Sequence, residues 1–212
     1  RMVVGFYIGF ENASYVTAMQ ALQVAMTDKV ELCRQYGYEI TIDEWPCIGL
    51  PDALLADRGE LLGHQIEALE HSFSIRIENT APYRGDLKPI VERYFRTAQA
   101  KFKPFAQGVV QPFKEKKRGG SDYRLDATLT IHDFKQIIIG SILTYNLTHQ
   151  LKKYDRDIDM PTDLPLVPIH LWNWGIQNRV GRLKQVSEKA LRVALLPKTK
   201  ATLSDLGLKV FG

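Results

Sequence analysis

The segments LLADRGEL (residues 54–61) and APYRGDLKPIVERYFRT (residues 81–97) decide how the fold of this chain is interpreted. Asp57 follows a short apolar run, and Glu92 lies 35 positions further on in an amphipathic stretch. Carboxylate oxygens are the ligands that Mg²⁺ prefers, so a strand-end Asp and a helical Glu suit part of a metal site. A simpler interpretation is that Asp57 caps the following helix and Glu92 pairs with Arg96.

Strands and helices alternate around these segments. Residues Ala53–Ala56 are predicted to form a short strand, followed by a helix at Glu60–His71. Alternating apolar residues predict a strand at Phe73–Ile77, and Asp86 is a suitable N-cap for a helix at Leu87–Phe102. The predicted core face of that helix consists of Ile90, Val91, Tyr94, Phe95, Ala98 and Phe102. This alternation indicates an α/β fold.

The flanking sequence supplies further elements. Residues Arg1–Phe10 are rich in β-branched and aromatic residues and are predicted to form a strand. Ser14 caps a predicted helix that begins at Tyr15 and ends near Gly37. The remaining predictions are a mixed connection at Tyr38–Pro51, a basic loop at Lys101–Arg124, a helix within Thr128–Gln150 capped by Thr130, a linker at Lys152–Pro168, short helices at Ile169–Gln177 and Leu183–Leu191, and strands within Arg192–Phe211.

Composition and charge set broad limits on function. The 212 residues are 45% hydrophobic and 25% charged, as is usual for a soluble globular protein, and they hold no apolar run long enough to span a membrane. The net charge of +4 favours a polyanionic partner only weakly. Cys33 and Cys47 show no metal-binding spacing, so we expect two buried thiols in a reducing cytoplasm.

Several strings together resemble the TnsB family of transposase subunits from Tn7-like elements, within the retroviral integrase and Mu transposase superfamily. The strings are VVGFYIGFENASYVTAMQAL (3–22), LPDALLADRGEL (50–61), APYRGDLKPIVERYFRT (81–97), DYRLDATLTIHDF (122–134) and ILTYN (142–146). The resemblance implies an RNase H-like core with a DDE carboxylate triad and two Mg²⁺ ions, or Mn²⁺ in their place. Asp57 matches the second acidic residue of the triad and Glu92 the third, so both are expected to be catalytic metal ligands.

The resemblance also implies a domain organisation and a function. Residues 1–154 would form a partial RNase H-like α/β core, 155–190 a helical linker, and 191–212 the start of a Mu-type C-terminal β-barrel. The implied activity is cleavage of transposon 3′ ends and their transfer into target DNA. The implied partners are DNA, further copies of the same protein, an ATPase regulator and an endonuclease subunit, with no membrane, in the bacterial cytoplasm.

The first acidic residue of the triad has no match in this sequence. The family carries it on the first strand of the core, whereas Arg1–Phe10 corresponds to the third strand, and neither Glu11 nor Asp28 fits the motif. We therefore expect a fragment that is inactive alone. Two alternatives stay open: an inactive RNase H-like module that holds DNA or partner subunits, and a related nuclease that hydrolyses without joining.

Basic residues near the two carboxylates are candidates for contact with DNA phosphates. The alternative is an exposed ion pair for Arg58, packing for Arg84 and solvated surface for the others. The candidates are Arg58, Arg84, Lys88, Arg93, Arg96, Lys114, Lys116, Lys117 and Arg118. The last four belong to a charge run that is more often simply a solvated loop.

Overall fold

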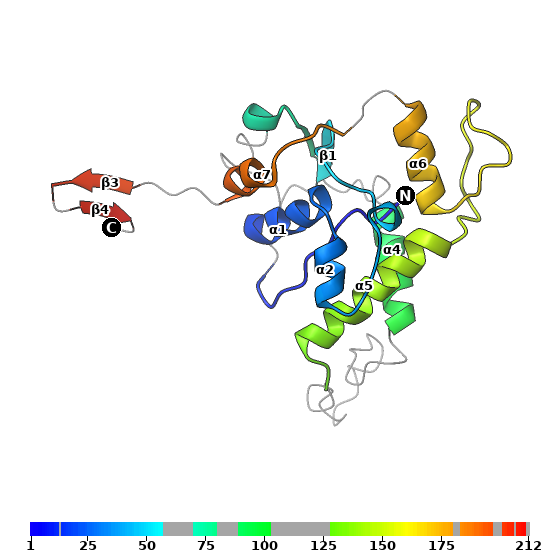
Figure 1. The fold of residues 1–212 in the computed structure, drawn as a ribbon, viewed down its shortest axis with the longest axis horizontal. Helices are drawn as coiled ribbons and strands as arrows, with labels where there is room; N and C mark the ends of the chain where they lie inside the picture. Colours follow the sequence, from blue (N-terminus) through cyan, green and yellow to red (C-terminus); the bar gives the residue numbers. More distant parts are fainter. Residues whose placement is uncertain are drawn as a thin grey trace, which may run out of the picture. The chain divides into compact units, whose positions relative to one another are not determined.

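The computed structural model describes residues 1–12, 14–56, 70–79, 89–102, 128–179, 183–196, 201–205 and 207–210 (Figure 1). The chain divides into two units that alternate along the sequence. The first consists of Arg1–Val4, Asp28–Cys47 and Tyr83–Arg182, and the second of Gly5–Thr27, Ile48–Pro82 and Leu183–Gly212. In the described residues, no helix is long and apolar enough to cross a membrane.

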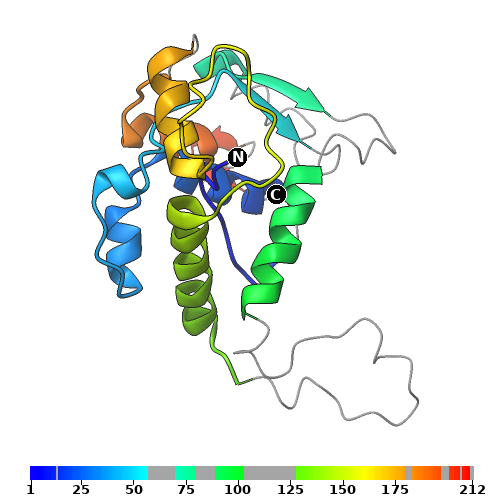
Figure 2. The same ribbon diagram turned by 90° about the vertical axis from the view of Figure 1, so that its right-hand side faces the viewer.

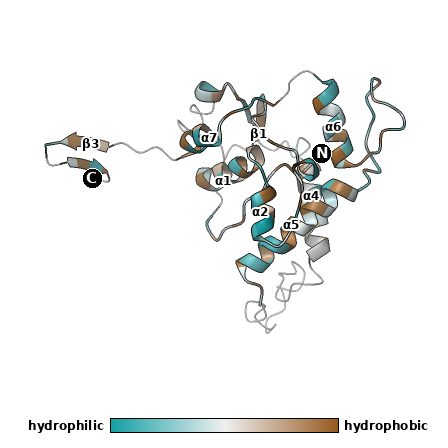
Figure 3. Cartoon of the chain, in the orientation of Figure 1, coloured by the Kyte–Doolittle hydropathy of each residue, from teal (hydrophilic) through white to brown (hydrophobic). Residues whose placement is uncertain are grey.

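The first unit is built on helices. It contains α2 (Val30–Gln35), the 3₁₀ helix η1 (Ile42–Glu44), α4 (Pro89–Phe102), α5 (Ile131–Thr148) and α6 (Pro168–Asn178). α5 packs against α4 on one side and α6 on another, and Figure 2 shows α4 and α5 side by side. Hydrophobic and hydrophilic residues alternate along α5 (Figure 3), whose buried residues include Ile139, Ile142 and Tyr145. The predicted Thr130 cap is confirmed, because its hydroxyl accepts from Asp133 N–H.

Residues Arg1–Phe10 do not form the predicted strand. Within residues 1–12 the structure assigns no helix or strand. The backbone near the start is instead held by side chains: Val3 N–H donates to Asn146 Oδ1, and Val3 carbonyl accepts from Asn146 Nδ2 and Trp45 Nε1, at 2.9 to 3.0 Å. These bonds satisfy groups that a neighbouring strand would otherwise satisfy.

The described residues of the second unit include the helices α1 (Tyr15–Met26) and α7 (Glu188–Leu195), a helical segment at 70–73 and four strands. β1 (Ala53–Ala56) pairs in parallel with β2 (Arg76–Asn79), with Ala53 opposite Arg76 and Ala56 opposite Asn79. β3 (Ala201–Ser204) and β4 (Gly207–Val210) form an antiparallel pair. The core of this unit contains Met19, Met26, Leu50, Ala56, Ile75, Leu191 and Leu195.

The element boundaries confirm some predictions and correct others. The strand at Ala53–Ala56, the Ser14 cap and the end near Gly37 are confirmed. The predicted helix from Tyr15 is nevertheless two helices. After α1, the Thr27 hydroxyl donates to Gln23 carbonyl, and before α2, Asp28 Oδ1 accepts from Val30 N–H. These local side-chain bonds interrupt the helix.

Two other elements are displaced from their predicted positions. Residues 70–73 are helical, and Ser74, at φ 54°, donates its N–H to Glu70 carbonyl, so β2 begins at Arg76 and not at Phe73. α7 begins at Glu188, after Ser187 accepts from Ala190 N–H, and not at Leu183.

The predicted core face of α4 is only partly buried. Ala98 is buried and Tyr94 packs against the cluster around Tyr145, whereas Val91 is 54% and Phe95 61% exposed. Periodicity correctly places these residues in a helix, but it cannot show which of them other segments cover.

Candidate nucleic-acid interface

The structure does not test whether Asp57 and Glu92 form a metal site. β1 ends at Ala56, so Asp57 is the next residue of the chain and lies outside the described residues. Glu92 belongs to α4, but its side chain is also outside them. Their approach to one another therefore stays a prediction. Among the described residues, no group of three or more His, Cys, Asp and Glu side chains could hold a metal ion.

Most of the predicted DNA-contacting residues also fall outside the described part of the chain. These are Arg58, Arg84, Lys88, Lys114, Lys116, Lys117 and Arg118. The structure places the other two, Arg93 and Arg96, in α4 with exposed side chains. Of these two, Arg93 lines a cavity.

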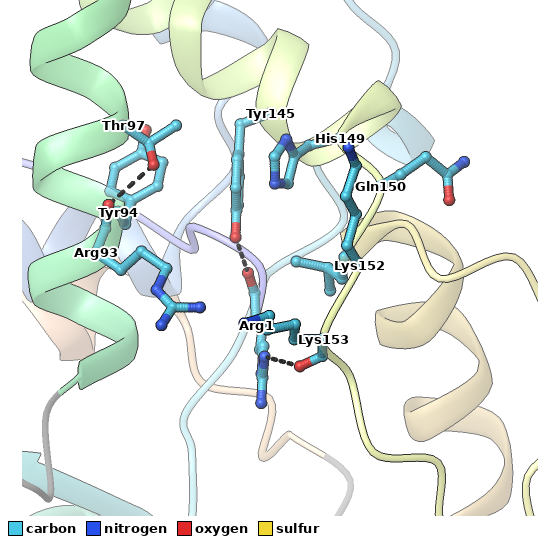
Figure 4. A pocket seen from close by; sticks show the side chains of 10 residues that line it. Arg1, Arg93, Tyr94, Thr97, Tyr145, His149, Gln150, Lys152 and Lys153 are labelled. Carbon is cyan, nitrogen blue, oxygen red and sulfur yellow. Dashed lines mark hydrogen bonds between the residues drawn. The ribbon is translucent and has the colours of Figure 1, made fainter.

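This cavity, the α4–α5 pocket, has a volume of about 520 Å³. Arg93, Tyr94 and Thr97 of α4 contribute one wall, and Figure 4 shows His149, Gln150, Lys152 and Lys153 on the other side of Arg1. The full lining is Arg1, Arg93, Tyr94, Thr97, Tyr145, His149, Gln150, Leu151, Lys152 and Lys153. No described residue of this lining is acidic.

Aromatic rings form the rigid part of the pocket. Tyr94 meets Tyr145 edge to face, with ring centroids 4.9 Å apart, and His149 stacks on Tyr145 at the same separation. Tyr145 donates its hydroxyl to Arg1 carbonyl at 3.2 Å. Burial raises the pKa of Tyr94 to about 12, so this phenol is neutral at physiological pH. The buried Tyr94 hydroxyl has no hydrogen-bond partner among the described residues.

The basic side chains of the pocket differ in their partners. The Arg1 guanidinium donates to Lys153 carbonyl at 3.2 Å and lies over the Tyr154 ring, 5.0 Å from its centroid. Arg93, Lys152 and Lys153 are exposed, and none forms an ion pair within the part of the chain that the structure describes. Arg93, Lys152 and Lys153 therefore line the same pocket, and none of its described lining residues is a carboxylate that could balance them.

The sequence does not predict that Lys152 and Lys153 line this pocket. It places both in a surface linker, because the stretch after the long helix is charged and interrupted by prolines. The available signal is their position a few residues after the end of α5 at Thr148. Leu151 N–H donates to Leu166 carbonyl at 2.8 Å and fixes the backbone just before the two lysines.

Comparison with known proteins establishes the family. Residues 1–108 match the profile of the TnsB C-terminal domain, and the chain belongs to that family. Along all 212 residues it is 54% identical to the transposition protein TnsB of transposon Tn7 from Escherichia coli. The chain spans 30% of the length of that protein. The resemblance found in the sequence strings is thus confirmed.

Proposed function

We propose that this chain is part of a DNA transposase that cleaves transposon 3′ ends and joins them to target DNA. The observation that carries the proposal is the 54% identity to a transposition protein along the whole chain. Two positions support it. Asp57 directly follows the last residue of β1, and Glu92 falls within α4, in agreement with a strand-end second carboxylate and a helical third one.

We propose that Asp57 and Glu92 bind Mg²⁺, or Mn²⁺ in its place, together with an acidic residue that this sequence does not supply. Both are hard oxygen donors and fit these cations. When bound, two such ions would orient the attacking oxygen and neutralise charge on the phosphate. Glu11 and Asp28 already have local partners, since Glu11 accepts from Tyr7 hydroxyl and Asp28 from Val30 N–H.

The proposed domains are an RNase H-like core at 1–154, a helical linker at 155–190 and the start of a β-barrel at 191–212. The parallel pair β1–β2, followed by α4 and α5, supports an α/β core. The antiparallel pair β3–β4 supports a small β domain after the linker. α7 begins at Glu188, within the proposed linker.

The proposed partners are transposon-end and target DNA, further copies of the protein, an ATPase regulator and an endonuclease subunit. Support for DNA comes from the exposed Arg93 and Arg96 on α4. The other partners rest on membership of the family alone.

A chimera tests the proposed activity. This chain would replace the matching 30% of the Escherichia coli protein, and end cleavage and strand transfer would be measured with Mg²⁺ and Mn²⁺. We expect the chimera to be active, and Asp57→Asn and Glu92→Gln each to abolish both steps while DNA binding persists. A folded, DNA-binding chimera without either activity would refute the proposal, as would full activity in both variants.

The same assay separates the alternatives. A related nuclease would cut ends but would not join pre-cut ends to target DNA. An inactive binding module would bind DNA with no cleavage in any metal. Asn79, paired with Ala56 at the end of β2, offers a matched control: Asn79→Ala alters the neighbouring strand end without removing a carboxylate.

A further inference from the structure

We infer that the α4–α5 pocket binds a phosphodiester group of a DNA strand. The inference rests on the proposed function, because it takes DNA as the partner. It assigns the phosphate-binding role to Arg93, Lys152 and Lys153.

The charge of the pocket favours an anion. Some exposed arginines of the described chain pair with carboxylates: Arg34 with Glu31 at 2.6 Å, and Arg76 with Glu78 at 2.8 Å. Arg93, Lys152 and Lys153 have no such partner in the described ranges, and Arg1 donates to a backbone carbonyl. Like charges that share a concave surface repel one another and raise the local positive potential. An anion is therefore the ligand that this lining favours.

The arrangement of the donors also favours a phosphate. Arg93 extends from α4, whereas Lys152 and Lys153 follow α5, so the cations approach the cavity from two walls (Figure 4). A phosphate with several free oxygens accepts hydrogen bonds from several directions, and Arg and Lys are its usual protein partners.

The rigidity and the size of the pocket also bear on which ligand it can hold. Tyr145 and Leu151 are buried, and Tyr94, Tyr145 and His149 pack ring against ring, so the floor is formed before any ligand arrives. A volume of about 520 Å³ exceeds what one phosphate needs and leaves room for the adjoining sugars. An open, roomy cation cluster suits a phosphate within a strand, although a free phosphate shares the same chemistry.

Binding of the 212-residue chain to fluorescein-labelled single-stranded and duplex DNA, followed by anisotropy over a range of salt concentrations, tests the inference. We expect Arg93→Ala, and the double variant Lys152→Ala with Lys153→Ala, to weaken binding roughly three- to tenfold. The salt slope should fall by about 1 for each phosphate that the variant no longer neutralises. Arg93→Lys should keep most of the salt slope. Arg192→Ala, which removes an exposed arginine from α7, is the matched control and should change neither quantity.

The outcomes distinguish the two proposals. If the parent chain binds DNA and the pocket variants match it in affinity and salt slope, the pocket assignment is wrong while the proposed function stands. If the parent chain does not bind DNA, the pocket assignment is wrong, and the chimera assay still decides the proposed function. Inorganic phosphate and ATP are the competing probes: saturation of the pocket by either, more tightly than by DNA and abolished in Arg93→Ala, would overturn DNA as the source of the phosphate. Thermal unfolding confirms that each variant is folded.

Discussion

Replacing the buried lysine Lys29 with methionine should stabilise the protein in a pH-dependent way. Lys29 is 1% exposed, and its ammonium donates to Cys47 carbonyl. Burial lowers its pKa from 10.5 to about 8, an effect that the neighbouring Cys47, Asp28 and Cys33 only partly oppose. The folded state therefore binds this proton more weakly than the unfolded chain does.

The magnitude follows from the size of this change in pKa. A fall from 10.5 to about 8 corresponds to roughly 3 kcal/mol of destabilisation whenever the lysine is charged. The unfolded state binds more protons between about pH 8 and 10.5, so stability rises with pH across that window, and the full cost is present below it. Lys29→Met removes the cost but leaves Cys47 carbonyl without this donor, at about 1–2 kcal/mol. The net gain at pH 7 should be about 1–2 kcal/mol.

Chemical denaturation of both proteins at a series of pH values measures this effect. The stability difference between Lys29→Met and the parent should be constant below about pH 8, then fall as pH rises towards 10.5, and change sign once the cost is gone. Taking the difference leaves only the change that loss of the Lys29 charge causes in the titration of Cys33 and Cys47, whose pKa values burial raises to about 11 and 12 and this charge lowers. A difference that does not vary between about pH 7 and 10 would refute the reasoning. Lys152→Met, at an exposed site, should show neither effect.

Three further substitutions test the packing of the first unit by denaturant unfolding. Asn146→Ala removes both hydrogen bonds to Val3 and should cost about 2–4 kcal/mol, whereas the exposed Asn173→Ala should cost little; equal effects would show that the bonds to Val3 are unimportant. Tyr94→Phe removes a buried hydroxyl without a described partner and should leave stability unchanged or raise it by up to about 1 kcal/mol; a loss above about 1 kcal/mol would reveal a partner. Thr130→Ala should lower stability by about 1 kcal/mol through loss of the α5 cap, and Thr130→Ser should restore it; no restoration would locate the effect elsewhere.

Local signals predict the elements whose causes are local. The apolar run Ala53–Ala56 forms β1, and the hydroxyls of Ser14 and Thr130 cap the helices that follow them. Residues Arg1–Phe10 have strand composition, but a strand also needs a partner for its backbone groups, and Val3 finds Asn146 instead, 143 positions away. Sequence composition cannot show a contact so distant.

The residues of the candidate site also differ in whether the sequence can reveal them. Asp57 and Glu92 are found through resemblance to a family, and their roles stay predictions. The pocket cannot be found that way, because it depends on α4 and α5 lying side by side, and α5 begins well after α4 ends. The spacing of Arg93 and Lys152 along the chain carries no sign that they line one cavity.

α4 connects the two proposed roles. Arg93 follows Glu92 directly, and consecutive residues of an α-helix are separated by a rise of only about 1.5 Å. The helix is held on α5 by the contact of Tyr94 with Tyr145, so a phosphate bound in the pocket would fix the DNA strand relative to the helix that carries the proposed catalytic carboxylate. A phosphate contact that is equally strong in the ground state and the transition state acts on binding, whereas the carboxylate acts on the reaction itself. Substitutions of these two adjacent residues should therefore have different effects. Loss of Arg93 should lower the affinity for DNA, and loss of Glu92 should lower the reaction rate of the bound complex.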